Sequence, residues 1–348
     1  MTTPVLALTM GDPAGIGPEI TARTLAEVAG EVGHRGVVVG DSEALRRGVQ
    51  ATGVPLTLRV VDRFDADPAG PGFVDCYDTG VLGTRLPPWG RVDARAGAAS
   101  VRAIEVATGA ALAGRVAGIV TGPINKEAIW AAGSTHLGHT EMLGALTGVT
   151  QQDTMFVVRN THVRGHHLRI FFTTRHVSLR KALEQLTPDL VAESARRAYR
   201  ALQVFGVDGP RLAVAAVNPH GGEGGAFGDE EIRAIAPACE RLRAEGLNIS
   251  GPIPADSVFH QGLMGRYDGV LSHYHDQGHI PAKTFDFDGT ISVTVGLPIL
   301  RTSVDHGTAF DIAGTGRAGH ATMLSAYRAA VDYTPYVDRI RATYPGAP

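Results

Sequence analysis

Residues 5–19, with the sequence VLALTMGDPAGIGPE, join an apolar run to a loop rich in glycine and proline and then to a helical stretch. An apolar run bounded in this way is typical of a buried strand, and Pro18 stands at a position favoured at a helix start. The loop superficially resembles a dinucleotide fingerprint, but its glycines at 11, 15 and 17 do not match G-x-G-x-x-G. No acidic residue ends a second strand in the expected way either. We therefore predict a strand, a loop and a helix that are not part of an ordinary Rossmann site.

The same alternation of apolar runs and helix-period stretches continues along the chain, which predicts parallel strands joined by crossover helices and an α/β fold. The predicted strands are Val5–Met10, Gly36–Gly40, Ala117–Thr121, Asp153–Val158, Leu168–Thr173, Leu212–Val217, Tyr267–Ser272 and Thr290–Val295. The predicted long helices are Ala94–Val116, Pro188–Phe205, Asp229–Glu245 and Ala321–Val331. The region 62–92, rich in Pro, Gly and Asp, predicts a surface excursion with at most one short strand.

The length of 348 residues exceeds one ordinary core, so we expect two α/β lobes with the active site in the cleft between them. The first lobe is expected to comprise residues 1–145 and 300–348, and the second residues 146–299. The net charge is only −3 and the 32 Lys and Arg residues are scattered, which argues against a nucleic-acid partner.

No apolar stretch is long enough to cross a bilayer, and no basic region precedes the first apolar run. We therefore expect a cytoplasmic protein that does not bind membranes. Cys76 and Cys239 lie far apart without Cys-x-x-Cys spacing, so we interpret them as reduced packing residues.

Three histidines, His176, His220 and His275, each follow an apolar run, at the strand ends where α/β sites are built. Neutral imidazole is the commonest ligand of a catalytic divalent ion, and three ligands leave positions open for substrate oxygens. A single histidine at a strand end is more often structural, and the long spacings give no local metal motif. A second group, His162, His166 and His167, lies in a polar stretch between two strands and indicates a solvated hairpin.

The segment 275–283, HDQGHIPAK, places a carboxylate at Asp276 and an amine at Lys283 after the same apolar run. Oxidation of an alcohol needs a base, and a lysine beside a cation can have its pKa lowered towards neutrality. Lys283 is therefore a candidate acid/base or anion ligand, and the alternative is a surface lysine on the following helix.

Two further segments indicate anion and cofactor binding. In 301–316, RTSVDHGTAFDIAGTG, the loop at 305–309 offers backbone N–H groups to a phosphate or ribose, and Asp311 could accept hydrogen bonds from ribose hydroxyls while repelling a 2′-phosphate. The alternative is that its glycines only make turns. In 138–142, GHTEM, His139 and Thr140 open a helical stretch, and the alternative is a threonine that only caps the helix.

Together these segments, with TGPINKEA at 121–128 and VNPHGGEGGAFGDEE at 217–231, resemble the 4-hydroxythreonine-4-phosphate dehydrogenase family of pyridoxal phosphate biosynthesis. The resemblance extends from about Val5 to Ala330. It implies a two-lobed α/β/α fold like that of isocitrate and isopropylmalate dehydrogenases, and a homodimer whose metal ligands come from both chains. The segment HGTAFDIAGTG is also similar to the adenosine-binding segment of those two enzymes.

The resemblance implies a role for each matching residue. His176, His220 and His275 would bind one divalent ion (Zn, Mg, Mn or Co), and Lys283 and Asp276 would serve in catalysis. Lys283, His139, Thr140, Ser292 and Arg301 would contact the substrate. NAD, with NADP as the alternative, would lie on Asp305, His306, Gly307, Thr308, Ala309, Asp311 and Ile312.

The implied reaction is metal-dependent, NAD-linked oxidation of the C3 hydroxyl of 4-phosphooxy-L-threonine, followed by decarboxylation to 3-amino-2-oxopropyl phosphate. Ser292 departs from the family pattern, which has asparagine there, and so leaves oxidation of 4-phospho-D-erythronate or 4-phospho-D-threonate as the alternative. A phosphate acyltransferase or a non-catalytic phosphate or metal sensor are alternatives of another class. An acyltransferase would have no need of three histidines or of the DHGTAFDIAG segment.

Overall fold

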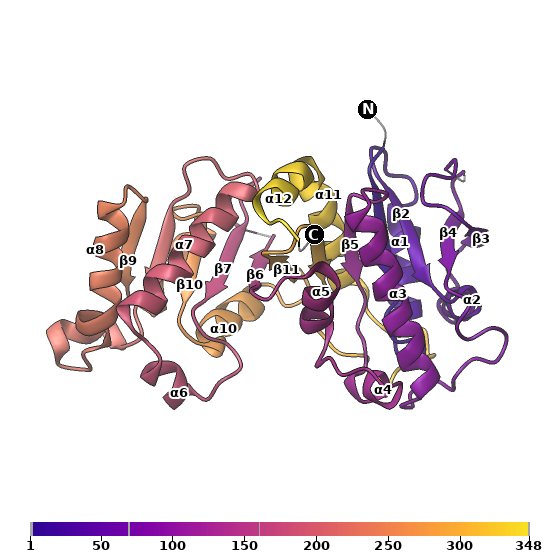
Figure 1. Ribbon diagram of the computed structural model, residues 1–348, viewed down its shortest axis with the longest axis horizontal. Coiled ribbons are helices and arrows are strands. Elements are labelled where there is room, and N and C mark those ends of the chain that lie inside the picture. The colour runs from indigo at the N-terminus through magenta and orange to yellow at the C-terminus, as the bar shows by residue number, and fades with distance from the viewer. Residues whose placement is uncertain (1–2, 69, 160, 347–348) are drawn as a thin grey trace. The chain divides into compact units, whose positions relative to one another are not determined.

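The computed structural model describes residues 3–68, 70–159 and 161–346 (Figure 1). The chain divides into two compact units. Unit 1 comprises Met1–Gln152 and Gly296–Pro348, and unit 2 comprises Asp153–Val295. The lobe boundaries expected from the sequence, 145/146 and 299/300, stay a prediction about domains. Each unit is described by itself.

The sheet of unit 1 is parallel at every described pair and has the order β3-β4-β2-β1-β5-β12. Its strands are β1 (Val5–Thr9), β2 (Arg35–Gly40), β3 (Thr57–Val61), β4 (Phe73–Asp78), β5 (Gly118–Thr121) and β12 (Leu300–Ser303). In chain order this sequence of strands is 3-4-2-1-5-6, whereas a Rossmann fold has 3-2-1-4-5-6. The predicted α/β class and the rejection of an ordinary Rossmann fold are both confirmed.

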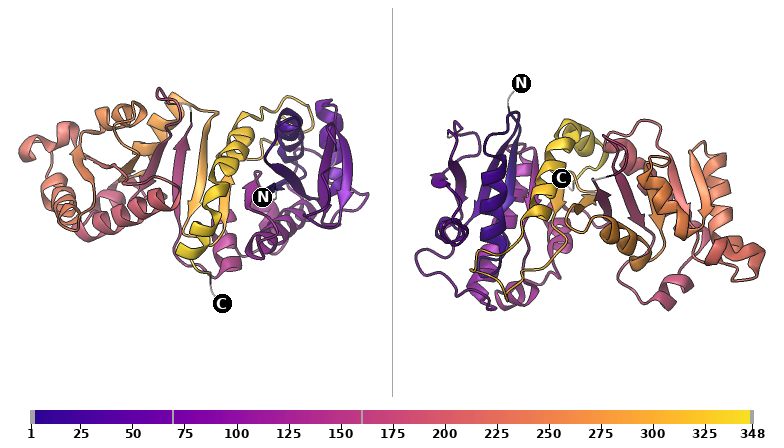
Figure 2. Two further views of the ribbon diagram at one scale, coloured as in Figure 1. Left: turned by 90° about the horizontal axis from the view of Figure 1, so that it is seen from above. Right: turned by 180° about the vertical axis from the view of Figure 1, so that it is seen from behind.

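Helices cover both faces of this sheet. Those on one face are α3 (Ala94–Leu112), α4 (Lys126–Ala131) and α5 (His139–Thr147), and those on the other are α1 (Gly17–Val28), α2 (Ser42–Thr52) and α11 (Ala321–Tyr333), which the two orientations in Figures 1 and 2 show in turn. The chain continues into η3 (Thr334–Tyr336) and α12 (Val337–Thr343). Asp93 caps the start of α3, where its side chain accepts two backbone N–H bonds. Its buried alanines at 103, 107 and 110 allow close packing on the sheet.

The sheet of unit 2 has the order β11-β6-β7-β10-β8-β9. Its strands are β6 (Asp153–Val158), β7 (Leu168–Phe172), β8 (Leu212–Ala215), β9 (Ile249–Ile253), β10 (Gly269–Ser272) and β11 (Thr290–Val295). The expectation of parallel strands is wrong for β6, which runs antiparallel to both β7 and β11. The connection 159–167 is too short for the crossover that a parallel pair needs, so β6 and β7 form a hairpin.

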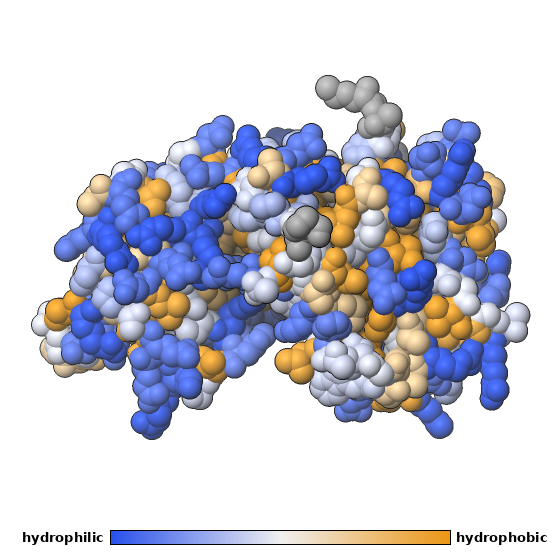
Figure 3. Space-filling view, in the orientation of Figure 1, coloured by the Kyte–Doolittle hydropathy of each residue, from blue (hydrophilic) through white to orange (hydrophobic). Residues whose placement is uncertain are grey.

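Helices also flank this second sheet. α7 (Pro188–Val204) and α8 (Ala236–Ala244) lie on one face, and α9 (Ala255–Leu263) and α10 (His275–Phe285) on the other. Three shorter elements are α6 (Leu179–Glu184), η1 (Pro219–Gly225) and the π-turn η2 (Glu231–Ile235). α7 starts at Thr187, which caps it, with Pro188 in the first turn. Its outward residues are charged and contribute to the hydrophilic surface over α7 in Figure 3.

All eight predicted strands are present, and the described residues of the region 62–92 include one strand, β4, as expected. The sequence does not predict three of the strands, β3, β9 and β12. β9 contains a Gly-Pro pair, and β12 is only four residues long and includes an arginine, so neither has the pattern of an apolar strand. The helix predicted at 229–245 is divided into η2 and α8. Within the described ranges, no helix has the length and apolar character needed to cross a bilayer.

Candidate active site

The carboxyl end of the unit 1 sheet holds a buried arginine. Arg301 lies on β12, beside β5, and only 6% of it is exposed. Its Nε and Nη2 groups donate to the hydroxyl oxygen of Thr121 at 3.1 and 2.7 Å, and that hydroxyl donates to Ser303 Oγ at 2.8 Å. Burial lowers the pKa of Arg301 to about 10, and the negative charge of Asp305 opposes that shift. A buried guanidinium held by a neutral hydroxyl is suited to binding an anion.

His139 belongs to the same group of residues. It is the first residue of α5, after Gly138 at the N-cap, and its Nε2 atom is inaccessible and has no hydrogen-bond partner in the part of the chain that the structure describes. Burial, and secondarily the positive charge of Arg301, hold the pKa of His139 well below its ordinary value. The ring is therefore neutral and can donate or accept a hydrogen bond at that buried nitrogen. An unsatisfied buried nitrogen of this kind indicates a ligand site.

Thr140 follows His139 at the start of α5. The capping alternative for this threonine is wrong, because Gly138 occupies the N-cap position and no side chain caps the helix. Its carbonyl accepts a bond of 2.6 Å from Gln152 Nε2, which ties the first turn to the residue that ends the first segment of unit 1. The structure thus brings His139, Thr140 and Arg301 into one unit and places Thr121, which the sequence did not single out, under the guanidinium.

The predicted cofactor loop is held against the loop that follows β1. Ile16 donates its N–H to the carbonyl of Thr308 at 3.0 Å, and a Cβ on Gly15 would lie 2.8 Å from Thr308 Cβ. Ala309 has φ of 42°, in the left-handed region that a non-glycine residue seldom adopts. Asp311 is exposed on this loop. A fixed backbone with an exposed carboxylate fits the predicted contact with ribose hydroxyls.

Glu19 fastens the end of the cofactor loop, although the sequence did not identify it as a site residue. Its carboxylate is fully buried on α1 and accepts the N–H groups of Gly314 and Gly316 at 2.5 and 2.8 Å. One helical turn later, Arg23 donates to the carbonyl of Gly316 at 2.6 Å. Both glycines have positive φ, and a Cβ on Gly314 would lie 2.4 Å from the ring of Trp89. These glycines therefore do make turns, and the turns are held by charged side chains.

Unit 2 brings two of the three predicted metal ligands near each other. The ring centres of His176 and His275 are 6.0 Å apart. His275 is the first residue of α10, and its Nδ1 lies 2.7 Å from Asp276 Oδ1, which leaves Nε2 facing away from that carboxylate. The ring of His279 stacks on that of His275 at 3.6 Å between centres. A carboxylate on the far nitrogen of an imidazole is the usual partner of a metal-binding histidine.

His220 lies in η1, in a run of five residues with positive φ from His220 to Gly224. The start of this loop is fixed by Glu231, which is buried and accepts the N–H groups of Val217 and Asn218 at 2.8 and 2.9 Å. Within the described ranges of one chain, no three His, Cys, Asp or Glu side chains are grouped so that they could hold a metal. The assignment of His220 to the same ion as the other two histidines stays a prediction, and the resemblance implies that the partner chain supplies part of that set.

The remaining predicted residues of unit 2 lie on α10 and β11. Lys283 is in the last turn of α10, not in a strand-to-helix turn with His275 as the sequence suggested, because the helix begins at His275 itself. It is half-buried, with its Nζ 5.4 Å from the centre of the Phe287 ring. Ser292 is buried on β11, opposite Phe156 of β6. Asp276 contacts His275, and its catalytic role stays a prediction.

The histidines fit a divalent ion by donor chemistry, and the rings of His176 and His275 lie close to the separation that a shared ion requires. An ion bound to a ring nitrogen lies about 3.2 Å from the ring centre, since the metal–nitrogen bond is about 2.1 Å, so two rings on one tetrahedral ion have centres about 5.2 Å apart. The ring centres of His176 and His275, 6.0 Å apart, exceed that separation by less than about 1 Å, so a small movement of the side chains would bring both rings to one ion. Imidazole donors suit borderline divalent ions such as Zn better than hard ions such as Mg or Mn.

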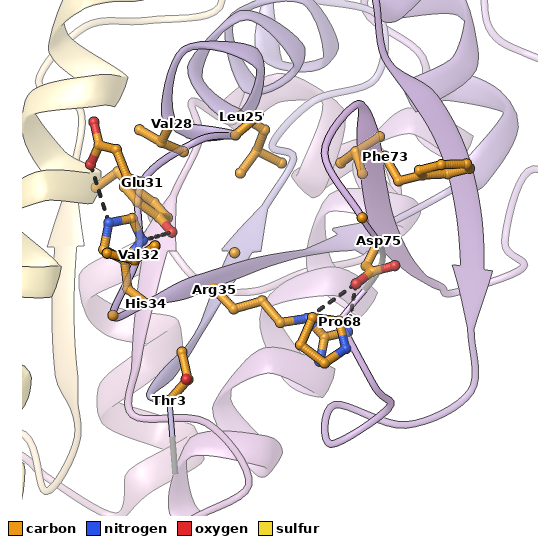
Figure 4. Close-up of a pocket in the computed structure, with 16 residues that line it drawn as sticks. Thr3, Leu25, Val28, Glu31, Val32, His34, Arg35, Pro68, Phe73 and Asp75 are labelled. Atoms are coloured by element: carbon orange, nitrogen blue, oxygen red, sulfur yellow. Dashed lines mark hydrogen bonds and ion pairs between the residues drawn. The ribbon is translucent and has the colours of Figure 1, made fainter. Parts of the chain in front are cut away.

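A separate pocket of about 340 Å³ lies at the opposite end of the unit 1 strands, where β2 and β4 begin (Figure 4). Its polar side chains pair with one another: Arg35 donates to Asp75 at 2.5 Å, and the His34 ring contacts Glu31 at 3.2 Å. Sites in α/β sheets form at the carboxyl ends of strands. This rule therefore favours the end of the sheet that holds Arg301, and not this pocket, as the candidate active site.

Comparison with known proteins gives agreement over almost the whole chain. The profile of the family described as pyridoxal phosphate biosynthetic protein PdxA matches residues 33–330. A protein of Cutibacterium acnes, provisionally named D-threonate 4-phosphate dehydrogenase, is 52% identical over 98% of this chain and 97% of its own length. One of Symbiobacterium thermophilum with the same provisional name is 48% identical over 98% and 99%. The solved 4-hydroxythreonine-4-phosphate dehydrogenase of Klebsiella pneumoniae is 43% identical, with a TM-score of 0.85 over 96% of this chain and 98% of that one.

Proposed function

This chain belongs to the family of pyridoxal phosphate biosynthetic protein PdxA, and from that membership we propose that it oxidises the C3 hydroxyl of a 4-phosphorylated four-carbon hydroxy acid. The resemblance inferred from the sequence motifs is confirmed, and the chain is a dehydrogenase that acts on a CH–OH group. The family implies a nicotinamide cofactor and a divalent metal. We propose NAD as the cofactor and the three histidines as the metal ligands.

The observation that carries the proposal is the buried Arg301 with the unpartnered Nε2 of His139. Arg301 is 6% exposed and donates to the neutral hydroxyl of Thr121, and a cation buried in this way favours an anionic ligand, because burying a cation costs free energy that an anion would offset. The phosphate or the carboxylate of a phosphorylated hydroxy acid would supply that anion. Neutral His139 would donate to the same group from Nε2.

We propose 4-phospho-D-threonate as the preferred substrate. Both relatives at 52% and 48% identity carry that substrate in their provisional names. Ser292 supports the choice, because its short hydroxyl stands at the position where the biosynthetic members carry an asparagine amide. A serine side chain on a buried strand leaves room and a hydrogen-bonding hydroxyl for a substrate that bears a hydroxyl at C2 in place of an amine.

The proposed reaction has two steps, oxidation at C3 and then decarboxylation. The C3–H bond breaks and the hydride passes to NAD, while the C3 hydroxyl proton passes to Lys283. The resulting β-keto acid loses C1 as carbon dioxide, and the carbanion at C2 takes a proton from the protonated lysine to give 1,3-dihydroxyacetone phosphate. The metal ion, when bound, would act as a Lewis acid that polarises the C3 oxygen. His275 would be held for that task by its bond to Asp276.

A second candidate substrate is 4-hydroxythreonine 4-phosphate, which gives 3-amino-2-oxopropyl phosphate. The solved relative at 43% identity, a 4-hydroxythreonine-4-phosphate dehydrogenase, favours it, as do the retained lysine, arginine and histidine positions. The two substrates differ only at C2, so the same site could oxidise both. Ser292 is the residue expected to discriminate between them.

The test is a substrate panel followed by absorbance of the reduced nicotinamide, with NAD, Co²⁺ or Zn²⁺ and each phosphorylated acid. We expect 4-phospho-D-threonate to have the highest kcat/KM and Ser292→Asn to move preference towards 4-hydroxythreonine phosphate by about tenfold. Ser250→Asn on β9 is the matched control and should change neither. A wild-type preference for the amino acid would establish the second candidate, and no reduction of NAD with any acid would favour an acyltransferase or a sensor.

A further inference from the structure

The residue that follows β10 by one position, His273, is a buried histidine in a unit whose predicted metal ligands lie nearer the surface. It is 1% exposed. Its Nε2 lies 2.8 Å from the carbonyl oxygen of Ala215, and its Nδ1 lies 3.1 Å from Thr173 Oγ1. A carbonyl can only accept, so Nε2 carries the hydrogen and Nδ1 accepts from the threonine hydroxyl. Both ring nitrogens are therefore used, and neither is available to a metal ion.

The main chain of His273 makes two more connections. Its N–H donates to Gln277 Oε1 at 2.7 Å, and the amide of Gln277 in turn donates to the carbonyl of Ala216 at 2.6 Å. Its carbonyl accepts from Thr174 Oγ1 at 2.8 Å. Gln277 is itself buried at 6% exposure. His273 and Gln277 thus bond to the residues at the ends of two other strands, β7 and β8.

These bonds join the three segments that lead to the predicted metal ligands. Thr173 and Thr174 lie directly after β7 and precede His176. Ala215 ends β8, and Ala216 follows it towards His220. His273 follows β10 and precedes His275. Each of the three predicted metal ligands is therefore at most five residues along the chain from a residue in this hydrogen-bond network.

We infer that His273, assisted by Gln277, is a positioning residue that sets the relative placement of the three segments bearing His176, His220 and His275. This inference rests on the proposed metal site. Groups that hydrogen-bond directly to metal ligands typically contribute about 10- to 100-fold to metal affinity, and His273 acts one step further out through the main chain, so we expect an effect at the lower end of that range. His273 does not contact the ion and is not a catalytic residue.

Two variants of His273, with asparagine or glutamine in its place, test its two ring hydrogen bonds separately, because these amide side chains differ in length. Asparagine places its amide near the level of Nδ1 of histidine, and glutamine near the level of Nε2. His273→Asn should keep the bond to Thr173 and lose the bond to Ala215, whereas His273→Gln should do the reverse. Thr173→Val removes only the hydroxyl and is the mildest variant. The control is His166→Asn, because His166 is half-buried in the same unit and its Nε2 bonds the carbonyl of Gly262 at 2.9 Å, away from the three segments.

The measurement is the dissociation constant of Co²⁺ for the full chain after chelator treatment, by calorimetry and by visible absorption, with thermal unfolding recorded in parallel. We expect His273→Asn and His273→Gln to bind Co²⁺ at least about tenfold more weakly and with altered absorption bands, and Thr173→Val about threefold more weakly. His166→Asn should lose stability without losing affinity for Co²⁺.

Two results would overturn the inference, and they distinguish failure of the metal site from failure of the role of His273. If the wild-type protein binds Co²⁺ no better than His275→Ala, the proposed metal site fails and the inference falls with it. If the wild-type protein binds Co²⁺ tightly but Thr173→Val and whichever His273 variants fold bind it equally well, the metal site stands and His273 is only a packing residue. A His273 variant that does not fold leaves Thr173→Val to decide between these results.

Discussion

Asp12, in the loop after β1, provides a prediction that depends on no ligand. Its carboxyl group is fully buried. Oδ1 accepts the N–H of Ala14 at 2.7 Å, and Oδ2 has no hydrogen-bond partner within the described residues. Burial raises the pKa of Asp12 from 3.8 to about 6, the charge of Asp93 adds to the rise, and backbone N–H groups oppose it. The perturbation is Asp12→Asn, which keeps the shape and the bond to Ala14 and removes the titration.

The sign of the effect follows from proton binding. The folded state binds the proton of Asp12 more tightly than the unfolded state, so stability falls as pH rises from about 4 to about 6 and then levels off. Two pKa units correspond to about 3 kcal/mol of unfolding free energy. The asparagine variant lacks this loss. The stability of the variant minus that of the wild type should therefore rise by about 2 kcal/mol between pH 4 and pH 7.

The assay is urea unfolding at half-unit steps of pH, followed by tryptophan fluorescence. Both tryptophans, Trp89 and Trp130, lie in unit 1 with Asp12, so the signal reports on the correct unit. Other titrating groups are common to both proteins and cancel in the difference, as does any constant cost of the new amide. A difference that stays constant within about 0.5 kcal/mol across this pH range would refute the argument that burial governs this carboxyl group.

Three further predictions concern the site in unit 1. Thr121→Val should raise the KM for the phosphorylated acid about tenfold with little change in the KM for NAD, because Arg301 loses the hydroxyl that orients it; equal KM values for wild type and variant would count against the anion site. Glu19→Gln should weaken NAD binding about tenfold in a fluorescence titration, because the amide cannot accept both glycine N–H groups of the cofactor loop; unchanged NAD binding, with the protein folded, would show that the loop holds its shape unaided. Asp311→Lys should improve kcat/KM with NADP relative to NAD by at least about tenfold, because a cation replaces the exposed carboxylate that would repel a 2′-phosphate; wild-type use of NADP equal to NAD would remove the premise.

The sequence by itself determined the features that depend on near neighbours. The alternation of apolar runs with helix-period stretches located all eight expected strands and the long helices, because side-chain burial repeats every two residues in a strand and about every 3.6 in a helix. The ordered motifs identified the family. Glycines at the helix ends, and residues such as Asp93 and Thr187 at the helix starts, act within a few residues of where they stand.

Only the tertiary structure decided what distant segments do to one another. His273 and His275 are the same residue type two positions apart. His273 is buried, with its ring nitrogens bonded to Ala215 of β8 and to Thr173, the residue after β7, whereas His275 is nearer the surface beside Asp276. Glu19 is an ordinary helix residue in the sequence, and only folding brings it to the N–H groups of Gly314, 295 residues along the chain. The physical reason is that burial and hydrogen-bond satisfaction are set by whichever segments pack together, and local periodicity carries no record of that pairing.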